Sequence, residues 1–163
     1  MGLFSNLFKK KPAKKSSEEL IAEYLQSKSL NGEKFNAKDY FAKDVLSNTA
    51  DVKLIAALKS ALGTNEVEPC GESVHNDWEV DFKYVNICIM INEFNDDGVM
   101  VVLGVENEVD KIDSVDIWVG VVDEPTVSIN LDKCPDGATD ASFIYQNAAQ
   151  KVKDYLSSKG LIK

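Results

Sequence analysis

The sequence predicts an α+β domain with N-terminal helices, a four- to five-stranded antiparallel meander sheet and a C-terminal helix. Three observations carry this prediction. Apolar residues recur at helical spacing early in the chain, alternate with polar residues in the middle, and return to helical spacing at the end. Helices that precede and follow a run of strands are typical of the α+β class, and short turns between consecutive strands favour a meander.

The first helix is expected to begin at Ser16 or Ser17 and to end at the Asn-Gly pair of 31–32. Ser16 and Glu19 have the spacing of a capping box, in which each side chain accepts a hydrogen bond from the other residue's backbone. We therefore divide the chain into a head, residues 1–15, and a single domain, residues 16–163.

Two further helices are expected before the sheet. The second covers 36–46, with Tyr40 and Phe41 pointing inward. The third covers 49–62 and ends at Gly63, because glycine readily adopts the left-handed conformation of a helix C-cap. Its expected apolar face consists of Val52, Ile55, Leu58 and Leu62.

Alternation of apolar and polar residues over 78–84 predicts the first, half-buried strand. At Tyr84-Val85 the alternation slips by one residue, which indicates a bulge or a break. The apolar positions then continue at Ile87, Ile89 and Ile91, and a hairpin turn is expected over 95–98.

Residues 99–105 are apolar at both odd-numbered and even-numbered positions, so both faces of a strand there are apolar. This predicts a central strand covered on both faces. A further strand is expected over 115–121, and a turn over 123–125. The last strand, over 127–131, has apolar residues at its odd-numbered positions only, so one of its faces is polar. A helix from about 139 to 158 ends the domain.

Charge is segregated along the chain. The net charge is −9, but residues 1–15 carry +5, and residues 66–140 hold three lysines against nineteen acids, a net −16. All basic residues are lysines, so the bidentate arginine contacts common at phosphate and base-reading sites are absent. This pattern disfavours nucleic acid as a partner and favours a basic protein.

We therefore expect a non-enzymatic interaction module that binds a basic protein through acidic residues of the sheet region, as an inhibitor, an immunity-type protein or a chaperone-like adaptor does. Simple solubility is the alternative explanation of the acidity. The candidate partner-binding residues are Glu79, Asp81, Asp96, Asp97, Asp110, Asp113, Asp116, Asp123 and Glu124.

The head is the second candidate site. Apolar pairs four residues apart are followed by a run of lysines, a combination that can hold a protein at the surface of a membrane. The candidate membrane-contact residues are Leu3, Phe4, Leu7, Phe8, Lys9, Lys10 and Lys11. A disordered head and a protein-docking head remain the alternatives.

Cysteine number and spacing favour the cytoplasm, with peripheral attachment to the inner membrane face as the alternative. Three cysteines at wide spacing do not form a secreted disulfide framework. Cys88 is expected in the core, and Cys70, His75 and Cys134 in loops. A Cys–His nucleophilic pair is conceivable, but no catalytic signature surrounds these residues.

No catalytic residue, cofactor or metal site is predicted. A loose calcium-loop match that begins at Glu93 places Gly104 where the ligand glutamate belongs, and glycine-rich phosphate loops are absent. A ligand-binding domain remains possible if a pocket is lined by Trp78, Tyr84 or Trp118. A homodimer is possible if one face of the sheet lacks helices.

Overall fold

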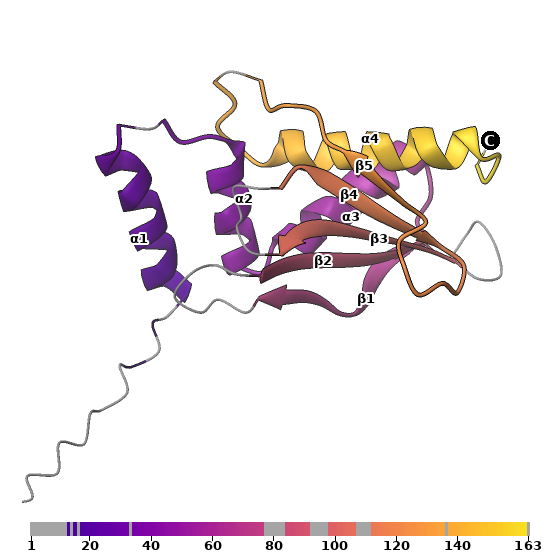
Figure 1. The fold of residues 1–163 in the computed structure, drawn as a ribbon, viewed down its shortest axis with the longest axis horizontal. Coiled ribbons are helices and arrows are strands. Elements are labelled where there is room, and N and C mark those ends of the chain that lie inside the picture. Colours follow the sequence, from indigo (N-terminus) through magenta and orange to yellow (C-terminus); the bar gives the residue numbers. More distant parts are fainter. Residues whose placement is uncertain are drawn as a thin grey trace, which may run out of the picture.

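The computed structural model describes residues 13, 15, 17–32, 34–76, 84–91, 98–106, 112–135 and 137–162. Its elements are α1 (Ser17–Leu30), α2 (Ala37–Leu46), α3 (Ala50–Leu62), β1 (Val67–Asn76), β2 (Tyr84–Ile91), β3 (Val99–Glu106), β4 (Ser114–Val119), β5 (Val127–Asn130) and α4 (Ser142–Ser158). The predicted α+β class is confirmed, with helices before and after a five-stranded sheet (Figure 1).

Local chemistry sets the helix ends where the sequence indicated. The Asn36 side chain accepts from the backbone of Lys38 and Asp39, and the Asp39 carboxylate accepts from the Asn36 backbone N–H at 2.7 Å, which completes a capping box before α2. Gly63 ends α3 with a φ of 69°, the left-handed conformation predicted for it. These caps satisfy backbone groups that the helices leave unpaired.

The five strands form an antiparallel meander in the order β1-β2-β3-β4-β5. The register pairs Ile89 of β2 with Val101 of β3, and Val101 with Ile117 of β4. Side chains of directly paired residues lie on the same face of a sheet, so these three belong to one face. β3 is the central strand, as predicted.

That face is covered by helices. α3 packs against β1 and β2, α4 packs against β4, and the two helices pack against each other. α1 lies beside α2 at one end of the sheet (Figure 1). Leu54, Leu58, Val152 and Leu156 from the helices join the inward residues of the strands in a core in which each is fully buried.

The opposite face of β3 departs from the prediction. Met100 and Val102 are half-buried instead of fully buried, and in the described part of the chain every helix that packs on the sheet contributes to the core on the other side. The apolar residues on the two faces of β3 thus have different surroundings. The prediction that β3 is covered on both faces is wrong for the described residues.

Strand β1 was not predicted. Residues Cys70 and His75, expected in loops, lie within it. Pro69, Gly71 and several polar residues hide its alternation, and the pairing with β2 shifts register between Pro69 and Val74. Proline is tolerated because β1 is an edge strand, where a missing N–H costs little. The expected strand over 78–84 lies outside the described residues except for Tyr84, where β2 begins.

Two side chains of the helices are also more exposed than expected. Tyr40 is 40% exposed and Val52 is 62% exposed. In α3 the buried positions are Ala50, Leu54 and Leu58, so the face that packs is rotated from the one inferred from Val52. Phe41 is fully buried, as predicted.

Candidate functional site

The side of the sheet on which no helix of the described residues packs carries a surface that we call the open face. It consists of Glu68 and Cys70 on β1, Cys88 and Met90 on β2, Met100 and Val102 on β3, and Asp116 and Trp118 on β4. On β2, β3 and β4 these residues alternate with buried core positions, so they point away from the helices. On β1, the pairing of Glu68 with Met90 and the contact of Cys70 with Met100 place both residues on the same face. All but Glu68, which is exposed, are half-buried.

Two rows of neighbours cross the open face. In one row Glu68 pairs with Met90, Met90 with Met100, and Met100 with Trp118. In the other row Cys88 pairs with Val102 and Val102 with Asp116. Methionine sulfur packs favourably against aromatic rings and adapts to irregular partners. The open face is therefore an adaptable apolar strip with a carboxylate near each side.

Sulfur atoms gather at the β1 side of this strip. The Cys70 thiol donates to Met100 Sδ at 4.0 Å. Burial, together with the neighbouring Cys70 thiol, raises the pKa of Cys88 to about 11. Cys88 is consequently a neutral thiol at physiological pH. It is half-buried on the open face instead of lying in the core as expected.

The charged side chains of the five strands are all acidic. They contain the acids Glu68, Glu72, Glu106 and Asp116 and no lysine at all. Two of these acids, Glu68 and Asp116, belong to the open face. Such a surface attracts cationic groups and repels anionic ones.

The structure brings one predicted partner-binding residue, Asp116, onto the open face. Asp113 is exposed just before β4, and Asp123 and Glu124 are exposed in the turn between β4 and β5. The other predicted acids lie outside the described residues, as do all candidate membrane-contact residues: Glu79, Asp81, Asp96, Asp97, Asp110, Leu3, Phe4, Leu7, Phe8, Lys9, Lys10 and Lys11.

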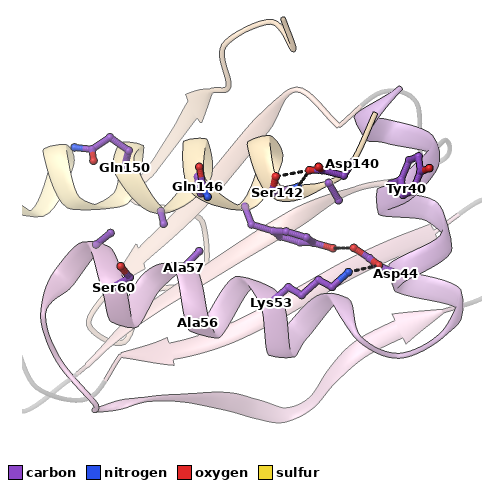
Figure 2. A pocket seen from close by; sticks show the side chains of 14 residues that line it. Tyr40, Asp44, Lys53, Ala56, Ala57, Ser60, Asp140, Ser142, Gln146 and Gln150 are labelled. Atoms are coloured by element: carbon purple, nitrogen blue, oxygen red, sulfur yellow. Dashed lines mark hydrogen bonds and ion pairs between the residues drawn. The ribbon is translucent and has the colours of Figure 1, made fainter. Parts of the chain in front are cut away.

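A groove between α2, α3 and α4 is the second candidate. Its volume is about 680 Å³, and its lining includes Tyr40 and Asp44 from α2, Lys53 from α3 and Gln146 from α4. Figure 2 shows Lys53 and Asp44 pointing toward one another at one end of the groove. Alanines of α3 form much of the remaining wall.

Asp44 is the only carboxylate of this lining that is buried. The Tyr145 hydroxyl donates to its Oδ2 at 3.0 Å, and Lys53 Nζ lies 2.6 Å from its Oδ1. Burial, and then the negative charge of Asp44, raise the pKa of Tyr145 far above its usual range, so Tyr145 remains a donor. Asp44 thus joins α2 to α3 and α4, and its oxygens are already occupied.

The groove consequently offers a binding surface more than a catalytic one. A general base needs a carboxylate free to accept a proton from a substrate, whereas three side-chain donors already hydrogen-bond to the carboxylate of Asp44. The aromatic residues of the lining are Tyr40 and Tyr145. Trp118, one of the residues expected to line a ligand pocket, lies on the open face.

Cys134 lies beside a smaller hollow, also lined by Phe35 and Pro135. Burial raises the pKa of the Cys134 thiol. Reactive cysteines have lowered pKa values, because the thiolate is the nucleophile. This environment gives no support to Cys134 as a catalytic residue.

The chain matches no protein-family model, no curated protein and no solved structure. Each helix in the described part of the chain is too short or too polar to cross a bilayer. Within the described residues, His, Cys, Asp and Glu side chains form no group of three that could hold a metal ion.

Proposed function

We propose that this protein is a non-enzymatic interaction module that binds a basic protein on the open face. The observation that carries the proposal is an apolar strip, built around Met90, Met100 and Trp118, on strands that contain acids and no lysine. Aromatic residues and methionine are enriched at the centres of protein interfaces, and charge complementarity selects the partner. An inhibitor, an immunity protein or a chaperone-like adaptor uses a surface of this kind.

A basic partner is favoured over a second copy of the chain. Two copies that met through the open face would bring Glu68 and Asp116 of one close to the same acids of the other, and each copy carries a net charge of −9. Like charges opposed across an interface cost several kcal/mol. A cationic surface, in contrast, gains attraction from the same residues.

The proposal is tested by capture and then by measured affinity. The full chain is used as bait in an extract of its source cells and washed at low and then high salt. We expect a stoichiometric protein of net positive charge that salt releases, since exposed charge pairs are screened by ions. The purified partner is then titrated against the chain and its variants.

Asp116→Lys reverses a charge on the open face, and Asp154→Lys makes the same change on α4, on the other side of the sheet. We expect the first variant to weaken binding at least tenfold and the second to change it less than twofold. Equal weakening by both, or a partner of net negative charge, contradicts the proposal. A stable dimer of the purified chain in analytical sedimentation would indicate that the partner is a second copy of the chain instead of a basic protein.

A second candidate is a membrane-peripheral accessory protein held by the head, favoured by the apolar pairs and five lysines of residues 1–15. Flotation with anionic vesicles at low salt tests it, with the chain lacking residues 1–15 as the control. The three free cysteines support a cytoplasmic location for either candidate, because free thiols persist in reducing compartments.

A further inference from the structure

Four sulfur-containing residues from three adjacent strands meet on the open face. Met90 and Met100 are direct partners across β2 and β3. Pro69 pairs with Ile89, and Cys70 follows it where the register shift of β1 begins. The Cys70 and Cys88 side chains are in hydrogen-bonding contact.

The sulfur atoms have the separation that a shared metal ion requires. Cys70 Sγ and Met100 Sδ are 4.0 Å apart. A metal ion with sulfur ligands at about 2.3 Å, arranged in a trigonal plane, sets its ligands about 4.0 Å from each other. Little movement is therefore needed for these two sulfurs to bind one ion. Cys88, whose side chain contacts that of Cys70, is available as a third ligand.

The ligand types identify the class of metal. Thiolate and thioether sulfur are soft ligands that select Cu(I), whereas magnesium and calcium prefer oxygen. Structural zinc takes four ligands, usually cysteine and histidine. Two cysteines with thioether neighbours do not supply that set, and the described residues hold no group of three His, Cys, Asp or Glu side chains suited to a metal.

We propose that Cys70, Cys88 and Met100 bind one Cu(I) ion on the open face, with the Met90 thioether beside them. Two S–H bonds break, both protons pass to solvent, and two copper–thiolate bonds form. The Met100 sulfur donates a lone pair, and copper stays in the +1 state, so no electron is transferred. The proposal goes beyond partner binding and does not depend on it.

The test is a competition titration of the full, reduced chain with Cu(I) under anaerobic conditions, with bicinchoninate as the competing chelator. A thiol assay on the unfolded protein first verifies three free thiols per chain. We expect one Cu(I) bound per chain. Cys88→Ser should abolish this binding, and Met100→Leu, which keeps the size of the side chain, should weaken it at least tenfold.

Cys134→Ser is the matched control, because it removes a thiol away from the open face, and it should leave binding unchanged. Circular dichroism verifies that each variant is folded. Absence of competition, full binding by Cys88→Ser, or loss of binding in Cys134→Ser overturns the proposal. Tighter binding of Zn²⁺ alone than of Cu(I) overturns the assignment of the metal. The isolated chain is used, so failure here leaves the proposed partner untouched.

Discussion

The two faces of the sheet use different residues for different tasks. On the covered face the inward side chains of β2 and β3 whose burial is described are isoleucine, valine or leucine, and each of them is fully buried. On the open face the described side chains of the same strands are cysteine, methionine and valine, and these are half-buried. The covered face has the branched aliphatic residues that a close-packed core selects, whereas the open face has soft and polarizable ones. The comparison indicates that the covered face supplies stability, whereas the open face is where we propose recognition.

The largest expected loss of stability comes from Ile89→Ala on the covered face. Ile89 is fully buried in the core, and truncation of its side chain leaves a cavity there, so the free energy of unfolding should fall by about 2–5 kcal/mol. Cys88→Ala, one residue away on the open face, should cost about 1 kcal/mol or less. Urea denaturation measures both. Equal losses would show that the open face is as tightly packed as the core.

A smaller effect is expected from the buried polar cluster of the helical layer. Asp44→Ala leaves the Tyr145 hydroxyl buried without its acceptor, which should cost about 1–3 kcal/mol in urea denaturation. Lys53→Met removes the other partner of Asp44, but Lys53 is half-exposed, so the loss should be about 1 kcal/mol or less. The reverse order would mean that the ion pair, not the hydrogen bond to Tyr145, joins the helices.

The open face should show its own pH dependence. The unfolded chain releases the Cys88 proton near the ordinary pKa of 9.0, whereas the folded protein holds it to about 11. In this window the folded state binds more protons, so this contribution to stability, present below pH 9, is lost as the pH rises toward 11. Cys88→Ala lacks it.

Urea denaturation of both chains at intervals from pH 8 to pH 11 measures this contribution. The difference in stability between the wild-type chain and Cys88→Ala should shrink as the pH increases. Tyr145, whose pKa is also raised, is present in both chains and cancels. Parallel curves would contradict the assignment of the raised pKa to Cys88.

The smallest change in stability is expected from Asp116→Lys, the variant expected to weaken partner binding at least tenfold. Asp116 is half-buried, and its side chain has no hydrogen-bond or ion-pair partner among the described residues, so the free energy of unfolding should change by about 0.5 kcal/mol or less. Asp154→Lys should be equally neutral. A large loss of stability with Asp116→Lys alone would show that Asp116 stabilises the fold. The distinction between a stabilising covered face and an open face free for binding would then be wrong.

The sequence predicted the fold wherever a local signal was strong. Asn36, Gly63 and the alternation through Ile87, Ile89 and Ile91 specify ends and faces within a few residues, because caps and alternation act locally. β1 was missed because Pro69 and Gly71 interrupt its pattern, and such residues are acceptable only once an edge position is known. Edge position is a property of the tertiary structure.

The open face was predictable only in part. Cys88 and Met90 alternate with the isoleucines of β2, so their common face follows from the sequence. That Cys70 joins them depends on the pairing of β1 with β2, for which no signal was visible. Acidity alone identified Asp116 together with other acids, and only strand position separates Asp116 from Asp123 and Glu124.

The two ends of the sheet have a consequence for how other molecules approach it. β5 has four residues, and β1 contains Pro69 and a shift of register. Short strands and interrupted edges prevent another chain from adding a strand, since too few backbone donors and acceptors line up. Both features disfavour lateral growth of the described sheet, the first step of fibril formation. A partner that binds as proposed would therefore lie across the strands, where side chains instead of backbone groups would select it.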